Sequence, residues 1–267
     1  MSTNATYEIY AVRYGHHPRK SAENFIGGDD HDTDMPLDYF VWAIVGDAKT
    51  YVLDTGFDPD VAKRRGRITT RPIAEGLKAV GIDAETVSDV IISHMHYDHA
   101  GNLGLFPNAR FHLQDAEMAY CTGRCMCHGV MRGAFEADNV ASMVHRVFEG
   151  RVEFHDGDCE FAPGITLHKL GGHTKGLQVA RVKTERGFVV LASDATHLYA
   201  NLELGHPFPV LADVGDYMEG LNTLRRLASS PHHIIPGHDP KVLRQYPAIR
   251  DDLADIVRVD VTPRQVD

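Results

Sequence analysis

The strongest constraint on this chain is a dense group of metal-binding side chains directly after an apolar run. The motif His94-x-His96-x-Asp98-His99 places three imidazoles and one carboxylate within six positions. The preceding run Val87–Ser93 is short and largely apolar, as is typical of a strand that is buried on both faces. Desolvating these four side chains together would be costly without a cation. The sequence therefore predicts a metal site at the end of a buried strand.

Further donors occur later in the chain, each at the end of a predicted strand and in a tight or glycine-flanked turn. These donors are His173, Asp194 and His238. In an α/β architecture the ends of strands are where site residues gather. One metal would take two ligands from a loop such as residues 94–99, so four donors predict two metals a few Å apart. Imidazole and carboxylate donors suit zinc, with iron or manganese as alternatives.

The order of predicted elements indicates an α/β chain. Alternating or continuous apolar patterns predict strands at Tyr7–Arg13, Tyr39–Val45, Thr50–Leu53, Val87–Ser93, Arg110–Leu113, Ile165–Leu170, Leu177–Lys183, Phe188–Ser193 and around Ile234. Helical patterns occupy Pro72–Val80, Gln114–Tyr120, Glu136–Phe148, Asp216–Leu227 and part of Lys241–Val257. Strands precede helices in both halves, which predicts two packed sheets flanked by helices within a single domain, residues 1–267. The polar stretch Arg19–Leu37 is predicted to be a long functional loop.

Composition narrows the classes of partner. The formal net charge of -10 argues against nucleic acid or an anionic membrane surface. The longest apolar run near the start, Phe40–Val45, is too short to span a bilayer. Residues 1–6 contain neither a basic stretch nor an apolar core, so we expect no signal peptide. Only 4 cysteines occur, which makes the cytoplasm the expected compartment.

Two other features receive ordinary interpretations. The basic run Lys63–Arg67 is predicted to be a solvated loop or helix end. The thiols of Cys121, Cys125 and Cys127 match no standard zinc spacing, so we interpret this region as an insertion that covers the substrate. Of the 17 histidines, those outside the motif and its later partners need no special role, apart from His197.

The motif and its later donors resemble the metallo-β-lactamase superfamily, and the turn Asp54-Thr55-Gly56 is similar to the early turn of that superfamily. Within it, the order HxHxDH…H…D…H most resembles the N-acyl homoserine lactonase family. The resemblance runs from about Tyr7 to Tyr246. It implies a four-layer αββα sandwich with two mixed sheets, two zinc ions, and the opening of a lactone ring.

The resemblance also implies how the donors divide. One zinc would be bound by His94, His96 and His173. The second would be bound by the other three donors, namely Asp98, His99 and His238, with Asp194 bridging both ions.

The same resemblance implies a mechanism. Two cations that share a water lower its pKa towards neutrality, and so supply a hydroxide for attack on the lactone carbonyl. Asp98 or Asp194 would carry the proton. Lactonases of this family have a tyrosine shortly after the bridging aspartate, whereas here the third following residue is His197 and the nearest tyrosine is Tyr199. Either side chain is a candidate to donate a hydrogen bond to the developing oxyanion.

The substrate is predicted to be an N-acyl homoserine lactone, in which case the protein would act in quorum quenching. A small acidic lactone from a catabolic pathway is the alternative, and it would require a cation; the available cations are Lys175, Arg124, Arg132 and Arg19. A thioesterase, a phosphodiesterase or another ester hydrolase of the superfamily would use the same metals. A non-enzymatic metal or ligand sensor on this fold is a further alternative. Members of this family often dimerise, so a homodimer is also considered.

Overall fold

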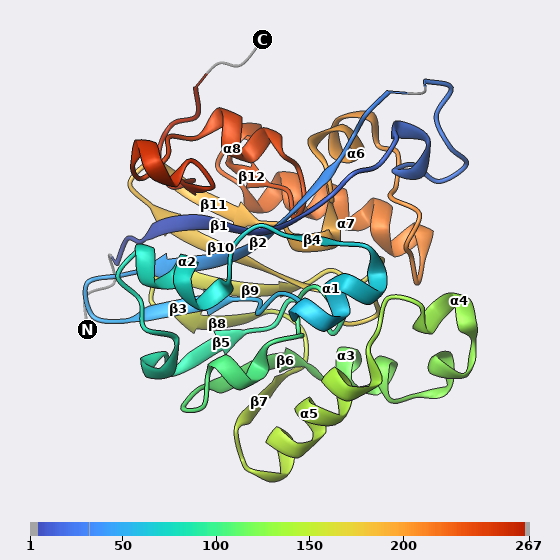
Figure 1. The fold of residues 1–267 in the computed structure, drawn as a ribbon, viewed down its shortest axis with the longest axis horizontal. Helices are drawn as coiled ribbons and strands as arrows, with labels where there is room; N and C mark the ends of the chain where they lie inside the picture. The colour runs from blue at the N-terminus through green and yellow to red at the C-terminus, as the bar shows by residue number, and fades with distance from the viewer. Residues whose placement is uncertain (1–4, 32, 265–267) are drawn as a thin grey trace.

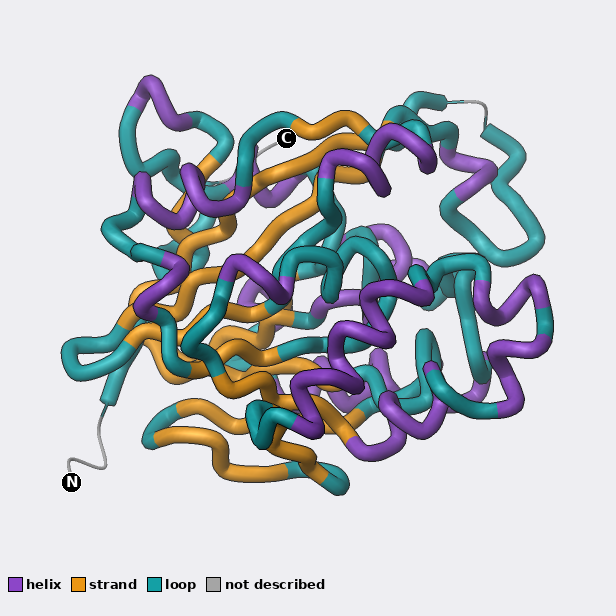
Figure 2. Tube along the Cα trace, turned by 60° about the horizontal axis from the view of Figure 1, so that its bottom comes forward, coloured by secondary structure: helices purple, strands orange, loops and turns teal. Residues whose placement is uncertain are grey.

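Two mixed β-sheets face each other at the centre of the molecule, and helices cover their outer faces (Figure 1). The computed structural model describes residues 5–31 and 33–264. Residues 1–4, on which part of the signal-peptide expectation rests, lie outside this range. In Figure 2 most of the strands run through the middle of the molecule, with helices and loops around them. This arrangement confirms the predicted four-layer α/β fold class.

The first sheet has the strand order β13-β1-β2-β3-β5-β6-β7, and β4 pairs with β1. Strands β1, β2 and β3 are antiparallel neighbours, whereas β3, β5, β6 and β7 pair in parallel. Its strands are β1 (Glu8–His17), β2 (Leu37–Val45), β3 (Thr50–Leu53), β4 (Ile68–Thr69), β5 (Asp89–Ile91), β6 (Arg110–Gln114), β7 (Val152–His155) and β13 (Ile256–Arg258).

The second sheet has the order β12-β11-β10-β9-β8. Strands β8 to β11 form an antiparallel meander, and β12 joins β11 in parallel. Its strands are β8 (Cys159–Ala162), β9 (Ile165–Lys169), β10 (Gln178–Thr184), β11 (Gly187–Leu191) and β12 (Ile234–Ile235).

Helices pack on both outer faces. They are α1 (Pro59–Arg65), α2 (Ile73–Ala79), α3 (Asp115–Cys121), α4 (Gly129–Arg132), α5 (Ala137–Phe148), α6 (Tyr199–Leu204), α7 (Val214–Leu227) and α8 (Lys241–Gln245). Helix α1 begins at the side-chain cap of Asp58 and ends at Gly66, which adopts the left-handed conformation with φ of 66°. No helix within the described residues is long and apolar enough to cross a membrane.

Alternation along the strands builds three apolar layers. On β2, Phe40 and Trp42 point between the two sheets, whereas Val41 and Ala43 point towards the helices on the outer face of the first sheet. On the outer face of the second sheet, residues of β10 and β11 pack against α7, including its Leu224. Burial on both faces explains why β2 reads as a continuous apolar run rather than an alternating one.

Most predicted strands and helices are present with shifts of a few residues, and the helix predicted within Lys241–Val257 is α8. The main omission is β13, because Ile256–Arg258 forms a strand on the edge of the first sheet beside β1. The register pairs Ala11 with Val257, so a partner more than two hundred residues away stabilises this short strand. Such pairing leaves no local signal in the sequence. The strands β7 and β8 and the helices α1 and α6 were not predicted.

Candidate metal centre

The predicted donors meet at one end of the sandwich, where strands of both sheets end. The loop of residues 94–99 follows β5, His173 follows β9, Asp194 follows β11 and His238 follows β12. All are buried. Donors from the two sheets therefore converge, as expected for side chains placed at the ends of strands.

One side chain fixes the end of β5 against the second sheet. The amide of Gln178, at the start of β10, donates to the carbonyls of Ile92 and His112 at 2.8 and 3.0 Å. The backbone N–H of Gln178 also donates to the carbonyl of Ser93 at 3.0 Å. This buried network holds the start of the donor loop at the junction between the sheets.

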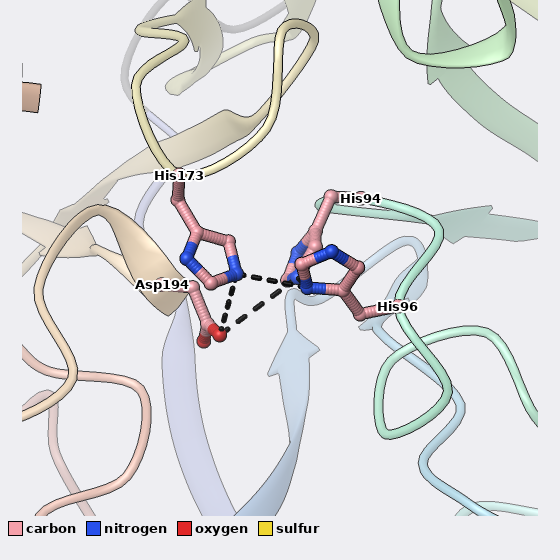
Figure 3. A group of neighbouring side chains, drawn as sticks. All are labelled: His94, His96, His173 and Asp194. Atoms are coloured by element: carbon pink, nitrogen blue, oxygen red, sulfur yellow. Dashed lines mark hydrogen bonds and ion pairs between the residues drawn. The ribbon is translucent and has the colours of Figure 1, made fainter. Parts of the chain in front are cut away.

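The first donor group consists of three imidazoles and one carboxylate oxygen (Figure 3). His96 Nδ1 lies 3.0 Å from His94 Nε2 and 2.9 Å from His173 Nε2. Asp194 Oδ2 lies 3.1 Å from His173 Nε2 and 3.8 Å from His94 Nε2. Tetrahedral nitrogen donors about 2.0–2.1 Å from an ion lie about 3.3 Å apart, so these separations fit a single ion.

The second donor group shares Asp194 with the first. Its other oxygen, Oδ1, lies 2.9 Å from His238 Nε2 and 3.3 Å from His99 Nε2. Asp98 Oδ2 lies 3.7 and 3.8 Å from the same two nitrogens. The two oxygens of one carboxylate thus face two separate donor groups, which is the geometry of a bridging ligand.

Unpartnered atoms indicate that this cluster suits cations. His99 Nε2 and Asp194 Oδ1 are buried and have no hydrogen-bond partner. Unsatisfied buried polar atoms are rare because each costs about 1–3 kcal/mol. Both atoms face the second donor group, so one divalent cation held there would satisfy them. The donor spacing of the first group fits a separate ion, so the residues present fit a dinuclear centre.

A turn after β3 supports the second group. Asp54 accepts hydrogen bonds from the Ser93 backbone N–H at 2.7 Å and from the Ser93 hydroxyl at 2.8 Å. Its Oδ2 also accepts from His99 Nδ1 at 2.8 Å, which directs Nε2 of that ring towards the donor group. Asp54 has a φ of 66°, a left-handed conformation that a non-glycine residue adopts only when its surroundings compensate for it.

Backbone carbonyls orient two other imidazoles. His173 Nδ1 donates to the carbonyl of Val210 at 2.8 Å, and His238 Nδ1 donates to the carbonyl of Asp38 at 3.0 Å. In both rings Nε2 therefore carries no proton in the neutral form and is free to bind a cation.

Glu117, on α3, joins the two loops that carry the first group. This fully buried carboxylate accepts from the Met95 N–H at 2.9 Å, the Thr174 hydroxyl at 2.6 Å and the Gly176 N–H at 3.1 Å. Burial raises the pKa of Glu117, although these hydrogen bonds oppose the rise. A Cβ at position 176 would lie 2.1 Å from the Glu117 backbone nitrogen, so only glycine fits there.

The electrostatics of the cluster differ between the two donor groups. Burial by itself would raise the pKa of Asp194, but the surrounding histidines, with His197 first, hold it well below its usual range. Burial lowers the pKa values of His94 and His96, and neighbouring imidazoles lower them further, so both rings are held in the neutral form that binds metals. Burial also lowers the pKa values of His99 and His238, but Asp194 and the other nearby carboxylates outweigh it and raise both. Metal binding to the second group therefore requires these two rings to release their protons.

The two candidates for oxyanion assistance lie in different places. His197 lines the cavity, its Nε2 is 3.0 Å from Asp194 Oδ2, and its ring stacks on Phe208 at 3.7 Å. Burial lowers the pKa of His197 to about 3, against the opposing effect of Asp194. Tyr199 instead belongs to the apolar layer between the sheets, to which Tyr246 also belongs. The prediction that Tyr199 reaches the substrate is therefore wrong, because α6 turns its side chain into the core.

A cavity of about 250 Å³ opens above the donor groups. Its lining is Arg19, Leu37, Tyr39, Arg65, Arg67, His96, Tyr97, Asp98, Val130, Gly133, Ala134, His173, Asp194, His197, Phe208, Val210 and His238. Leu37 and Arg19 belong to the stretch predicted to be a functional loop. Of the four predicted substrate cations only Arg19 is present; the three that are absent from the lining are Lys175, Arg124 and Arg132, all of which are exposed.

Among the residues of this wall that sequence reasoning missed, four carry a hydroxyl or a guanidinium group, namely Tyr39, Tyr97, Arg65 and Arg67. Tyr97 lies inside the donor motif and Tyr39 begins the apolar part of β2, so neither stood out as polar. The basic run does form a helix end, as predicted, since Lys63–Arg65 is the last turn of α1. Arg65 and Arg67 are half-buried beside the cavity rather than solvated. Gly66, which lies between them, could have indicated this position, because a glycine at the end of a helix marks a change of chain direction.

The segment that contains the three cysteines leads into one wall of the cavity. Cys121, Cys125 and Cys127 are all free thiols, and they belong to none of the His/Cys/Asp/Glu groups that could hold a metal among the described residues. The segment that follows them contributes Val130 and Ala134 to the cavity wall.

The fold and the donor groups together define a class: four-layer α/β sandwiches with a two-metal donor set at the strand ends. Residues 35–238 match the family model of the metallo-beta-lactamase superfamily, a span of more than half of the chain. The chain belongs to the metallo-beta-lactamase superfamily.

Known proteins with this fold include lactone hydrolases. The chain is 32% identical over 133 residues to the N-acyl homoserine lactonase of Bacillus cereus, covering 49% of the chain and 48% of that protein, or about half its length. It is 26% identical over 211 residues to the N-acyl homoserine lactonase AiiB of Agrobacterium fabrum, covering 71% and 75%. A solved N-acyl homoserine lactone hydrolase, with the product N-hexanoyl-L-homoserine bound at its catalytic metal center, superposes with a TM-score of 0.73 at 22% identity, covering 90% and 96%.

Proposed function

We propose that this protein is a dinuclear-metal lactonase that hydrolyses the ester bond of a lactone ring. The observation that carries the proposal is the division of the two Asp194 oxygens between two donor groups at the floor of one cavity. The names of the relatives that share the donor order support the choice of a lactone. Zinc is the proposed metal, because the donor set combines imidazole with carboxylate, and iron or manganese would suit the same donors.

The two donor groups divide the proposed ligands as follows: His94, His96 and His173 in one, Asp98, His99 and His238 in the other, with Asp194 shared. When bound, two such cations polarise a carbonyl and lower the pKa of water towards neutrality. In the overall reaction the oxygen of water bonds to the carbonyl carbon, the ring C–O bond breaks, and the ring oxygen takes a proton. The product is an open hydroxy acid.

Three side chains of the chain would assist this reaction. His197 holds Asp194 Oδ2 through Nε2 at 3.0 Å and would keep the carboxylate oriented between the two groups. Asp98 faces the cavity and would carry the proton from water to the leaving oxygen. The Tyr97 hydroxyl, which also lines the cavity, would donate to the developing oxyanion in the role that Tyr199 cannot fill.

N-acyl homoserine lactones are the first substrates to consider, and hydrolysis of them would make the protein a quorum-quenching enzyme. Apolar side chains of the cavity wall, Val130, Phe208 and Val210, would contact a short acyl chain. Val130 is 90% exposed and Val210 40% exposed, so a longer chain would extend over the rim.

The decisive experiment is proton release by metal-replete protein on a panel of lactones with acyl chains of different lengths. An acyl thioester and a phosphodiester serve as competing substrate classes. We expect lactone turnover together with two metal equivalents per chain. Turnover of the thioester or phosphodiester alone would replace the lactonase proposal with that activity. Well under two equivalents in folded, inactive protein would favour a sensor.

The single-domain organisation, the cytoplasmic location and the possible homodimer stay predictions.

A further inference from the structure

Arginine side chains form the wall of the cavity around the donor groups. Arg19 lies near the start of the loop between β1 and β2, and Arg65 and Arg67 flank the turn after α1. The three guanidinium groups differ in whether an acidic partner balances them. That difference separates a structural arginine from arginines that are free to bind a ligand.

Arg65 is balanced. Its Nε donates to a carboxylate oxygen of Glu136 at 2.7 Å, and its terminal nitrogens donate to the carbonyls of Gly133 and Phe135 at 2.9 and 3.2 Å. The guanidinium also lies 4.2 Å from the centre of the Tyr97 ring. Arg65 therefore ties the turn after α1 to the segment before α5 and supports the aromatic wall.

Arg67 is half-buried without an acidic partner. Its Nε donates to the Tyr97 hydroxyl at 2.9 Å and its Nη1 donates to the carbonyl of Arg65 at 2.6 Å. Within residues 5–31 and 33–264 it makes no ion pair with a carboxylate, and no hydrogen bond uses its Nη2. The neutral hydrogen bonds fix the direction of the group. Burial lowers the pKa of Arg67, but Tyr39, Tyr97 and Asp98 outweigh it and raise the pKa, so the cation is stabilised at a distance rather than by a direct ion pair.

The positive charge of Arg19 is likewise not balanced by an ion pair with a carboxylate among the described residues. One terminal nitrogen donates to the backbone carbonyl of Glu23, and the guanidinium lies 5.1 Å from the centre of the Phe208 ring. Its Nε is buried with no hydrogen-bond partner. Burial lowers the pKa of Arg19, and the nearby cation of Arg67 adds to this effect. Two like charges held beside one cavity repel each other unless an anion lies between them.

We infer that Arg67, with Arg19, forms a subsite for an anionic group on the part of the substrate that does not react, so that the preferred substrate is a small lactone bearing a carboxylate. This inference rests on the proposed lactonase function. The planar guanidinium fork matches a carboxylate, and the donors would be Nη2 of Arg67 and Nη1 of Arg19, which form no hydrogen bond among the described residues. The volume of about 250 Å³ fits a compact acid rather than a long acyl chain.

The test compares lactones that differ in charge and are otherwise matched. The first pair is 5-oxotetrahydrofuran-2-carboxylate and its neutral carboxamide. The second pair is N-succinyl and N-(4-methylpentanoyl) homoserine lactone, which carry a carboxylate or an isopropyl group at the end of the same acyl chain. The two pairs place the anion at different distances from the ring. Each is assayed with metal-replete protein by proton release.

We expect kcat/KM to be about tenfold or more higher for the acid in at least one pair, because a charge-assisted hydrogen bond contributes about 10- to 100-fold in binding. Arg67→Met should remove this preference, with the KM of the acid rising more than the KM of its neutral partner. Because Arg67 also donates to the Tyr97 hydroxyl, a fall in kcat that is common to both partners does not count towards the preference. Arg19→Gln should reduce the preference, and Arg67→Lys should restore part of it. The matched control is Arg64→Gln, since Arg64 pairs with Glu136 and does not line the cavity.

A binding measurement separates failure of the subsite from failure of the lactonase proposal. Calorimetry with 2-hydroxyglutarate, the hydrolysis product of the first acid, is done on metal-depleted full-length protein whose folding is verified by thermal melting. Binding that is lost in Arg67→Met and kept in Arg64→Gln supports the subsite even if no lactone is turned over. Hydrolysis of lactones without charge preference would overturn the subsite and leave the lactonase function intact. Absence of both binding and preference overturns the inference.

Discussion

Asp54 Oδ2 lies 2.8 Å from Nδ1 of His99, and this contact fixes the direction in which the imidazole offers Nε2 to the second donor group. Substituting Asp54→Asn removes the negative charge, so the orientation of the His99 ring is no longer fixed. We expect metal affinity at one of two sites to fall about 10- to 100-fold. A titration with zinc against a chelating dye measures both sites, and Asp60→Asn, an exposed change on α1, is the control. Two unaltered affinities in Asp54→Asn would contradict the proposed role of the turn.

His96 contributes the nitrogen that lies closest to both other imidazoles of the first group. His96→Ala should lower the metal content from two equivalents to about one and remove most lactone turnover, because the remaining donors no longer surround an ion. Metal analysis of the purified variant, together with proton release, tests this. Full activity with two metals per chain would end the dinuclear interpretation.

His197 belongs to the candidate site, whereas Tyr199 belongs to the core, and substitutions should distinguish the two. His197→Ala should lower kcat about tenfold or more, since Asp194 loses a partner at 3.0 Å. Tyr199→Phe should leave kcat nearly unchanged, because the Tyr199 side chain lies in the core between the sheets and does not line the cavity. Steady-state kinetics of both variants decides between them. The reverse pattern would return the tyrosine to the mechanism.

Gly176 allows α3 to approach the loop of His173. In Gly176→Ala the added carbon would meet backbone atoms of Glu117 at 2.1 Å, so we expect a loss of about 1–3 kcal/mol in the free energy of unfolding. Urea unfolding of metal-depleted protein measures it. Gly104→Ala, where the added carbon meets nothing within 4 Å, is the matched control. Equal effects of the two changes would show that the contact is relieved without cost.

The half-buried His17 lies near the arginine wall, and its pKa is lowered from 6.5 to about 4 by burial and then by Arg67 and Arg19. Between these two pH values the unfolded chain binds a proton that the folded chain does not, so this histidine lowers stability as the pH falls from about 6.5 towards 4. His17→Gln should therefore lose less stability over this range than the parent. Melting temperatures at several pH values test this, with the exposed His145→Gln as control. Parallel curves for parent and His17→Gln would contradict it.

The sequence allowed the donors to be found because their spacing is local. Four of them lie within residues 94–99, and the others follow strands with clear apolar patterns. The same reasoning predicted the two sheets, since burial on both faces leaves a continuous apolar signature, as in β2.

The cavity wall could not be predicted in the same way. Arg67 and Tyr97 are thirty residues apart and meet only because the turn after α1 returns to the donor loop. A basic run on a helix end is usually solvated, so composition favoured the wrong interpretation for Arg65 and Arg67. Likewise β13 is held by its partner β1 rather than by its own three residues.

The donors of each group come from both halves of the chain, and this affects when the protein can first take up its metals. During synthesis, His94 and His96 leave the ribosome long before their partners His173 and Asp194. For the proposed centre, the first donor group is complete only when residue 194 has emerged, and the second only when residue 238 has. The order of synthesis therefore completes the first group before the second, and neither full donor set exists in a chain that ends before residue 194.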